Sequence, residues 1–471
     1  MAAALEIEKA GEKGESFLSE GHEGQKVPRS AGQSWVELET YMPRDEAAKM
    51  EQKYEKIGTT GTAMSFITMM FGAGVLAFPK KFSVVGMPMG IGMVSLAGLM
   101  SAYLCCTMNQ AVSRVQKRTG MRIQSLDDIG FACYGNVGRV AVRTIINSFL
   151  VAKTAVYIVL SSQNLTFIMS PPAYRGWVII GSAVFISMAF VKSASMLEKI
   201  SFVSVVCSVC YFFPIIGASL YAHFEEDSPS AGCDFWKLDA GGFTVPSQEL
   251  LPALTIFVLG FGPVDVIATA RRNIVDENRM PQAIIGSHIV TVFFYALAGA
   301  VGFWGFGEAV DGDITQSMRN GDDKWLTGYG LAAAVVVNLV VTIPITLYCL
   351  YSSLEVTLGK MSPAANAAMR VSIVLLCTVI GLLLPYFMQC LEILSAAMIV
   401  PLSIFLPLAI GPKSAHDDGT PYSWSRYAFD LVLWAIGFGC FFMGMYSAID
   451  GLKREMKENP DGANPFAKPW F

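Results

Sequence analysis

Two short glycine-containing runs, each followed by a proline, are the parts of this sequence best suited to bind a ligand through the main chain. Residues 72–74 (Gly-Ala-Gly) lie within an apolar stretch that continues to Pro79, and residues 260–263 (Gly-Phe-Gly-Pro) lie within another. Glycine weakens a helix, and a proline at 263 cannot donate to the carbonyl four residues earlier. We therefore predict a break in each of these two helices, which leaves peptide N–H and C=O groups available at both.

Peptide groups at membrane depth need a partner, because no bulk water is present to hydrogen-bond with them. The N-terminus of a half-helix offers N–H groups to a carboxylate, and the C-terminus offers carbonyls to an ammonium group. A free α-amino acid carries both charges and is the ligand that this pattern predicts. The alternative is that small residues only let helices pack closely, but two interruptions at matching positions of two halves favour a binding site.

Lys153 and Asp265 are ionisable residues predicted to lie at membrane depth, where a charge needs a partner or a wet cavity. Three interpretations are open: the two residues pair, Asp265 attracts the side chain of a cationic substrate, or Asp265 carries a proton. Tyr157 either closes over the substrate or packs as an ordinary aromatic residue. Glu392 begins a later apolar stretch, and a carboxylate at the outer interface is favoured there over a gate.

Asn338 and Thr342 are four residues apart and share one face of a predicted helix. With main-chain carbonyls near Gly72 they would offer oxygen ligands to Na⁺, although hydrogen bonding between helices is the favoured explanation. We predict no metal site and no cofactor, because the histidines and cysteines lack the spacing of zinc ligands. The predicted substrate-binding residues are Gly72, Ala73, Gly74, Tyr157, Gly260, Phe261, Gly262 and Asp265, and the predicted ion-coupling residues are Gly72, Asn338, Thr342 and Asp265.

The elements that must position these residues are membrane-spanning helices. The composition is 53% hydrophobic and 15% charged, an apolar surplus that needs a lipid bilayer around it. A net charge of −4 argues against a nucleic-acid partner. A spanning helix needs roughly 20 apolar residues, and eleven stretches qualify: 59–79, 87–112, 140–169, 174–192, 200–222, 250–270, 283–306, 326–352, 366–388, 390–411 and 425–450.

The loop charges orient these spans, because basic residues concentrate in every second loop. That bias predicts a cytosolic N-terminus and, with an odd number of spans, a C-terminus on the other side. The predicted organisation is a disordered cytosolic tail (1–56), a first five-helix repeat (57–222), an extracytosolic loop (223–249), a second five-helix repeat (250–412), a loop with a last helix (413–450) and a C-terminal tail (451–471).

Several short motifs in this order resemble those of the amino acid/auxin permease family, a branch of the amino acid–polyamine–organocation superfamily. Residues 71–79 (Phe-Gly-Ala-Gly-Val-Leu-Ala-Phe-Pro) are similar to its first-helix signature of the type Gly-x-Gly-x-Leu-x-x-Pro. The further motifs are 156–157 (Val-Tyr), 163–165 (Gln-Asn-Leu), 197–201 (Leu-Glu-Lys-Ile-Ser), 302–307 (Gly-Phe-Trp-Gly-Phe-Gly), 313–315 (Asp-Ile-Thr) and 342–344 (Thr-Ile-Pro). Residues 257–265 and Lys80-Lys81 depart from the family pattern, which leaves the substrate open.

The resemblance implies an all-α membrane protein with 11 helices: two inverted five-helix repeats with broken helices 1 and 6, and one extra C-terminal helix. It also implies ion-coupled, secondary active amino-acid transport, for which we favour H⁺ over Na⁺ and expect cationic amino acids as candidate substrates. The expected location is the plasma membrane or a vacuolar or lysosomal membrane. The alternative function is an amino-acid sensor with little flux. An enzyme is not expected, since no nucleophile pair or phosphate-binding loop is visible.

Overall fold

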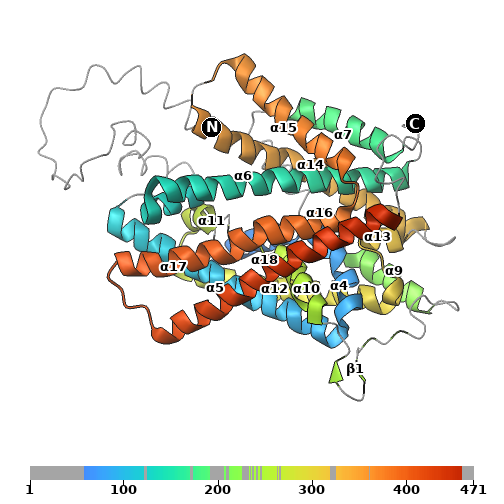
Figure 1. The fold of residues 1–471 in the computed structure, drawn as a ribbon, viewed down its shortest axis with the longest axis horizontal. Coiled ribbons are helices and arrows are strands. Elements are labelled where there is room, and N and C mark those ends of the chain that lie inside the picture. Colours follow the sequence, from blue (N-terminus) through green and yellow to red (C-terminus); the bar gives the residue numbers. More distant parts are fainter. Residues whose placement is uncertain are drawn as a thin grey trace, which may run out of the picture.

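In the residues that it describes, the computed structural model is helical apart from one short pair of antiparallel strands, in which Leu238 lies opposite Phe243 (Figure 1). The predicted tail at 1–56 and the predicted site residue Asp265 lie outside the residues that the structure describes. Those residues are 58–120, 123, 125–169, 173–190, 206–207, 210, 212–224, 233, 235, 238–239, 242–243, 247–262, 264, 267–318, 325–359 and 361–458.

The helices and strands follow the predicted spans in order. They are α3 (Thr59–Met70), the 3₁₀ turn η3 (Ala73–Ala77), α4 (Phe78–Val85), α5 (Met87–Thr119), α6 (Leu126–Ile168), α7 (Tyr174–Met188), α9 (Phe212–Phe224), β1 (Leu238–Asp239), β2 (Gly242–Phe243), α10 (Ser247–Gly260), α11 (Ile267–Asn273), η5 (Glu277–Arg279), α12 (Met280–Phe306), η6 (Gly307–Ala309), α13 (Ile314–Ser317), α14 (Trp325–Leu358), α15 (Pro363–Leu383), α16 (Phe387–Leu394), the π turns η7 (Ser395–Ile399) and η8 (Pro401–Phe405), α17 (Leu406–Asp417) and α18 (Trp424–Glu458).

Seven helices in the described part of the chain are long and apolar enough to cross a membrane: α5, α6, α12, α14, α15, the continuous α16–α17 helix and α18. The bent pair of α3 and α4 makes an eighth span, and α7, α9 and α10 are shorter apolar helices at the remaining predicted positions. The predicted all-α membrane fold is therefore confirmed. Whether each short helix belongs to a complete span, giving eleven, stays a prediction.

The helix α6 begins well before the predicted third span. Its N-terminus is closed by a capping box, in which Ser125 N–H donates to the Asp128 carboxylate (3.1 Å). Gly135 has a φ of +64° and kinks the helix after its first turns. The Arg143 guanidinium pairs with the Asp127 carboxylate across this kink (2.5 Å). The predicted spans 87–112 and 140–169 left this segment between them, whereas capping and charge pairing keep it helical.

The tenth predicted span is one continuous helix from α16 to α17 that contains two π turns. Val400 N–H donates to the carbonyl of Ser395, and Leu406 N–H donates to the carbonyl of Pro401, each five residues back. Such widened turns occur often at functional sites. The hydroxyl of Ser395 donates to the carbonyl of Thr255 (2.5 Å), so the first π turn is joined to α10.

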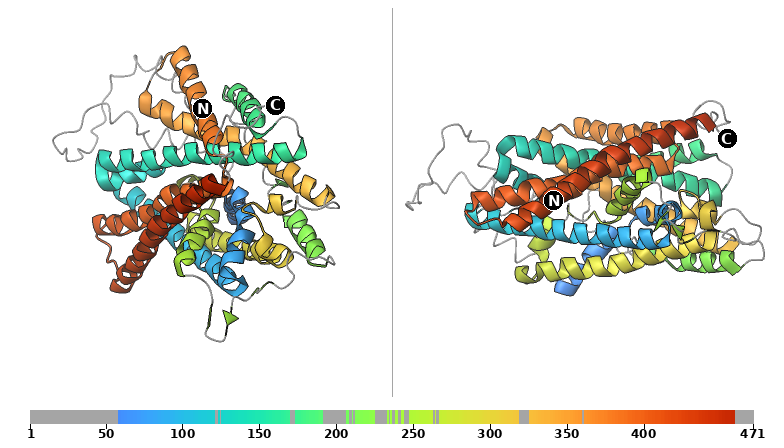
Figure 2. Two further views of the ribbon diagram at one scale, coloured as in Figure 1. Left: turned by 45° about the vertical axis from the view of Figure 1, so that its right-hand side comes forward. Right: turned by 60° about the horizontal axis from the view of Figure 1, so that its bottom comes forward.

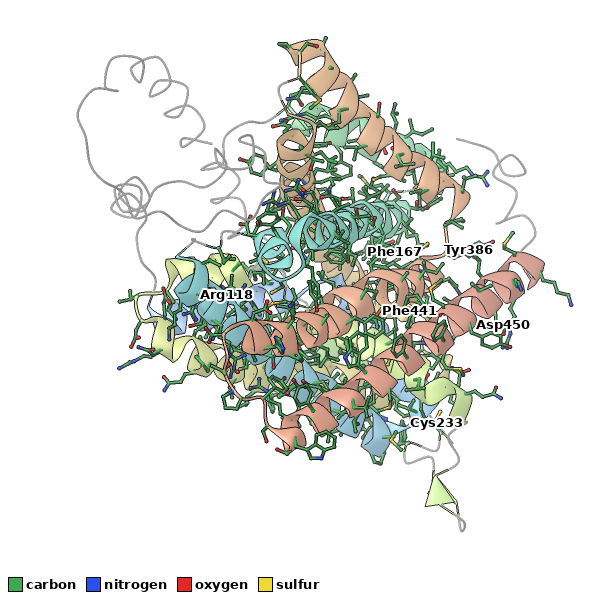
Figure 3. The ribbon with its side chains drawn as sticks, turned by 60° about the vertical axis from the view of Figure 1, so that its left-hand side comes forward. Arg118, Phe167, Cys233, Tyr386, Phe441 and Asp450 are labelled. Atoms are coloured by element: carbon green, nitrogen blue, oxygen red, sulfur yellow. The ribbon has the colours of Figure 1, made fainter. Side chains whose placement is uncertain are left out.

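The helices form two groups that meet at the centre of the molecule (Figures 1 and 2). One group consists of α6, α7, α14 and α15, which pack on one another. The other contains α5, α10 and α12 with the two parts of the first span, and α18 lies across α10 and α16. Figure 3 shows Arg118 at one end of the bundle and Tyr386 and Asp450 at the other. The helix α18 continues to Glu458, past the boundary at 450 that we predicted.

The outer surface of this bundle is apolar, as expected for a protein surrounded by lipid. Large hydrophobic side chains such as Leu99, Phe293, Leu431 and Phe442 are more than 60% exposed. A patch of this kind would be an aggregation hazard in water. The protein is therefore an integral, multi-pass membrane protein, as the sequence predicts.

Candidate functional site

The first predicted break is present at residues 71–72. The helix α3 ends at Met70, Gly72 has an extended conformation, and the chain resumes as the 3₁₀ turn η3. The axes before and after the break differ by 52°. A Cβ atom at Gly72 would meet the Tyr157 hydroxyl at 3.6 Å, an ordinary contact. Glycine is therefore not required there by backbone strain, and its absent side chain instead leaves space beside Tyr157.

The second predicted break follows α10, which ends at Gly260, and precedes α11, which begins at Ile267. Between them the structure describes residues 261, 262 and 264, and Pro263 lies outside the described residues. A Cβ atom at Gly260 would lie 2.7 Å from the Tyr295 ring and 2.8 Å from the Phe78 ring. Here the small residue is required, because two aromatic rings pack directly against the backbone.

A cavity of about 70 Å³ lies between the two breaks. This is well below the roughly 300–1,000 Å³ of a site for a drug-sized ligand, so the cavity suits a small molecule. The first break, α6, the end of α10 and the α16–α17 helix contribute its walls: Met69, Met70, Gly72, Gly74, Phe149, Lys153, Tyr157, Leu259, Gly260, Gly262, Leu391, Leu394 and Ile399.

Most of the predicted substrate-binding residues meet at this cavity. Gly72, Gly74, Tyr157, Gly260 and Gly262 all line it. Ala73 begins η3 between two lining residues, and the buried Phe261 lies between two others. Asp265 is outside the described residues, so its three interpretations stay predictions.

Lys153 brings a positive charge to the cavity wall. Its ammonium group lies 5.6 Å from the ring centres of both Phe149 and Tyr157, one turn before and after it on α6. Such distances allow cation–π attraction to both rings. The arrangement holds the ammonium group over the face of α6 that borders the first break.

Tyr295 on α12 is a site residue that the sequence analysis missed. Its hydroxyl donates to the main-chain carbonyl of Met70 and lies 3.3 Å from the carbonyl of Gly260. One side chain thus contacts the half-helix ends of both breaks. The available signal was a tyrosine in the middle of an apolar helix, where a buried hydroxyl needs a partner.

A second polar cluster, which the sequence analysis also missed, contacts the backbone of the sixth-helix break. Ser101 Oγ is 2.6 Å from the carbonyl oxygen of Phe261 and 3.0 Å from Nε2 of His288. The other ring nitrogen of His288, Nδ1, is 2.8 Å from the carbonyl oxygen of Ile284. The cluster joins α5 and α12 to the backbone of the break.

Glu392 is buried in an ion pair, whereas we expected a carboxylate exposed at the outer interface. Its carboxylate is paired with Lys81 at 2.6 Å, and the two side chains are only 10% and 7% exposed. The expectation rested on the position of Glu392 near the start of its apolar stretch, whereas a lysine of α4 neutralises it inside the bundle. The pair joins the second half of the first span to α16.

Asn338 and Thr342 share one face of α14, as predicted. The hydroxyl of Thr342 donates to the Asn338 carbonyl (2.7 Å) and lies 3.3 Å from its side-chain oxygen. Neither residue is among those that line the cavity in the described part of the chain. A Na⁺ site shared with Gly72 stays a prediction. The described residues also contain no group of three or more His, Cys, Asp or Glu placed to hold a metal ion.

The known proteins to which this chain is similar include transporters. In sequence, the chain is similar to amino acid transporter AVT1E of Arabidopsis thaliana (22% identity, 84% of this chain and 73% of that one) and to AVT1H of the same plant (20%, 87% and 92%). In structure, it is similar to Mhp1, a nucleobase-cation-symport-1 family transporter in a closed conformation with bromovinylhydantoin bound (TM-score 0.51, 14% identity, 89% of this chain and 96% of that one). Residues 55–450 match the model of one family, described as transmembrane amino acid transporter protein. The chain belongs to this family.

Proposed function

We propose that this chain carries amino acids across a membrane by alternating access, with the substrate bound between the two helix breaks. The observation that carries the proposal is that a single cavity is bounded by both breaks, at Gly72 and Gly74 and at Gly260 and Gly262. The names of its relatives, which are amino acid transporters, support the same substrate class.

The chemistry of the two breaks suits a zwitterion. At each break one half-helix ends and another begins, so partial negative charge from carbonyls and partial positive charge from N–H groups lie side by side. The carbonyl ends at Met70 and Gly260 would accept from the α-ammonium group of the substrate. The N–H groups at the start of η3, together with Lys153, would hold its α-carboxylate.

We further propose a small neutral side chain as the preferred one. The cavity is small, and Lys153 is a cation on its wall. A lysine or arginine substrate would bring a second positive charge close to this one, whereas a neutral side chain would not. The expectation of a cationic substrate rests on Asp265.

Two polar contacts on opposite sides of the breaks are suited to open in turn. The Lys81–Glu392 pair fastens α4 to α16. Arg271 on α11 donates to Asn109 on α5 (2.7 Å) and to Glu277 (2.5 Å). The elements α4 and α11 each follow a break, and they pack against different half-helices, α10 and α3. Breaking one contact while keeping the other would admit the substrate from one side only.

Uptake into liposomes that contain the purified full-length protein tests the proposal. We expect saturable uptake of labelled neutral amino acids that unlabelled substrate competes with and that an inward H⁺ gradient drives. Gly72→Ala should weaken uptake because its methyl group projects toward Tyr157. Gly92→Ala is the matched control, since a Cβ atom at that position meets nothing within 4 Å. Binding without flux would instead establish the sensor, and neither binding nor flux for any amino acid would contradict the proposal.

A further inference from the structure

The cluster of Ser101, His288 and Phe261 lies beside the substrate cavity without being part of its wall. Ser101 is on α5 and His288 is on α12, and both are almost fully buried, with 4% and 2% of their surface exposed. The Phe261 carbonyl belongs to the break between α10 and α11, next to the cavity residues Gly260 and Gly262. A change in this cluster therefore acts directly on the backbone that borders the substrate.

The number of protons in the cluster decides how many of its hydrogen bonds can form. The Ile284 carbonyl can only accept, so Nδ1 of His288 carries a proton at 2.8 Å from it. In the neutral ring Nε2 is then an acceptor. Ser101 has one hydroxyl proton and two acceptors within reach, Nε2 at 3.0 Å and the Phe261 carbonyl at 2.6 Å. One of those two contacts must lack a proton.

A second proton on the imidazole completes the cluster. Nε2–H then donates to Ser101 Oγ, and the Ser101 hydroxyl donates to the Phe261 carbonyl, so every contact has one donor and one acceptor. The chain of bonds runs unbroken from α12 through α5 to the sixth-helix break. We propose that His288 binds the coupling proton of this transporter and that Ser101 transmits its presence to the break; this inference rests on the transport function proposed above.

The described surroundings of His288 provide no competing charge in contact with it. The Phe261 ring stacks on the imidazole at 6.1 Å, and Cys105 Sγ lies 4.0 Å from Ser101 Oγ. The half-helix α3 carries no titratable side chain. Several titratable groups on α12 or on the elements packed against it have contacts elsewhere: Tyr295 with Met70, Arg271 with Glu277, Arg279 with Asp276, Lys81 with Glu392, Tyr103 with Asp430, Arg118 with Asp417, and His223 with Trp304. The same elements also carry Lys80, Cys106, Arg114, Lys117, Tyr221 and Glu308, none of which is among the hydrogen-bond partners of the His288 ring.

No carboxylate among these residues contacts His288, so the protonated imidazole has no negatively charged partner there. A buried unpaired charge is costly, so the imidazolium needs all of its hydrogen bonds. A substrate that orders the break would hold the Phe261 carbonyl toward Ser101, which directs the serine hydroxyl to that carbonyl and leaves Oγ as the acceptor for Nε2–H. Substrate and proton would then bind together and leave together, which is the requirement for symport.

The test compares exchange with accumulation in liposomes that contain the full-length protein. Exchange of labelled for unlabelled amino acid at equal pH needs no gradient, whereas accumulation under a pH gradient needs proton coupling. One proton per neutral substrate allows at most about tenfold accumulation for one pH unit, since each 1.4 kcal/mol is a factor of ten. Proton entry that depends on substrate is followed with a pH-sensitive dye inside the liposomes.

We expect His288→Gln to retain exchange but to reduce the accumulation ratio to about 1 and to abolish substrate-dependent proton entry. Ser101→Ala should lower the ratio as well, because the serine link to Phe261 is lost while His288 is retained. Ser95→Ala is the matched control on α5, since that hydroxyl bonds only within its own helix, to the Ile91 carbonyl. His223→Gln is the control for removing a histidine.

Wild-type accumulation and proton entry in His288→Gln would overturn the inference. If His288→Gln lost exchange as well, Ser101→Ala would decide, and full coupling in that variant would also overturn it. Loss of proton entry in Asp265→Asn, with coupling intact in both other variants, would assign the proton to Asp265 instead. Wild-type exchange without any proton entry would reject His288 yet leave the transport function standing, whereas no exchange at all would reject the transport function.

Discussion

The hydroxyl of Tyr295 donates a hydrogen bond to the main-chain carbonyl of Met70, the last residue before the first helix breaks. The same hydroxyl lies 3.3 Å from the Gly260 carbonyl at the second break. A single side chain of α12 thus sets the relative position of the two half-helix ends that bound the cavity. The geometry of the cavity depends on a residue that is not among those lining it.

Replacing this tyrosine should weaken both the fold and the site. Tyr295→Phe removes one of the two donors to the buried Met70 carbonyl and leaves the Gly72 N–H at 2.7 Å, which costs roughly 0.5–1.5 kcal/mol, and it releases the two breaks from each other. We expect a lower melting temperature in detergent and a higher KM for uptake. Tyr446→Phe on α18, where the side chain is 65% exposed, should change neither. Wild-type melting and KM in Tyr295→Phe would show that the hydroxyl does not position the breaks.

The glycines of the two breaks should respond differently to the same added methyl group. At Gly260 a Cβ atom would lie 2.7 Å from the Tyr295 ring, so Gly260→Ala should reduce the melting temperature and the yield of folded protein. At Gly72 the nearest atom is 3.6 Å away. Gly72→Ala should therefore fold normally and lose substrate affinity. Equal melting temperatures for the two variants would contradict this difference.

Stability should depend on Lys81 and Glu392 being present or absent together. Removing one partner leaves an uncompensated buried charge, at a cost of about 3–5 kcal/mol. We expect Lys81→Met alone to be strongly destabilised, and Lys81→Met combined with Glu392→Leu to recover most of the melting temperature. If the pair is a closing contact of the transport cycle, the double variant should fold yet show an altered uptake rate. A double variant as unstable as Lys81→Met would argue against the pairing.

Asp313 should make the stability depend on pH. It lies between α12 and α14, outside the spanning helices, and burial raises its pKa to about 6 despite hydrogen bonds from Thr315 and Asn164. The folded state therefore holds the proton more tightly than the unfolded state. This contribution is fully present below about pH 4 and is lost as the pH rises through about 6.

Melting temperatures of the wild type and of Asp313→Asn between pH 4 and pH 8 isolate this contribution, because other groups titrate equally in both. The asparagine keeps an acceptor for the Thr315 N–H, 3.0 Å away in the wild type. We expect the wild type to lose stability relative to the variant across this range. A constant difference would mean that Asp313 does not titrate there.

The breaks could be predicted from the sequence because their signal is local. Residues 72–74 and 260–263 lie within apolar stretches and contain glycine and, at 263, proline. Glycine weakens a helix and proline lacks the N–H donor that a helix needs, so both favour a break at these positions. Tyr157 was singled out in the third predicted span, where residues 156–157 resemble a family motif, and not by the break signal. Gly72, Gly74, Tyr157, Gly260 and Gly262 line one cavity, and their role in binding stays a prediction.

The partners of the buried polar side chains could not be predicted, because they are distant in sequence. Tyr295 and Met70 are 225 positions apart, Ser101 and His288 are 187 apart, and Lys81 and Glu392 are 311 apart. A single sequence shows that each of these residues is polar and in an apolar stretch, but not which helix faces it. The same limit explains why Glu392 was expected to be exposed at the interface.

A structure of the protein with a transported amino acid bound tests the central claim most directly. We expect the ligand between the two breaks, with its carboxylate near the start of η3 and Lys153 and its ammonium group near the carbonyls of Met70 and Gly260. Both helices should remain interrupted around it. A ligand bound elsewhere, or two helices that run straight and continuous past residues 72 and 261, would contradict the account.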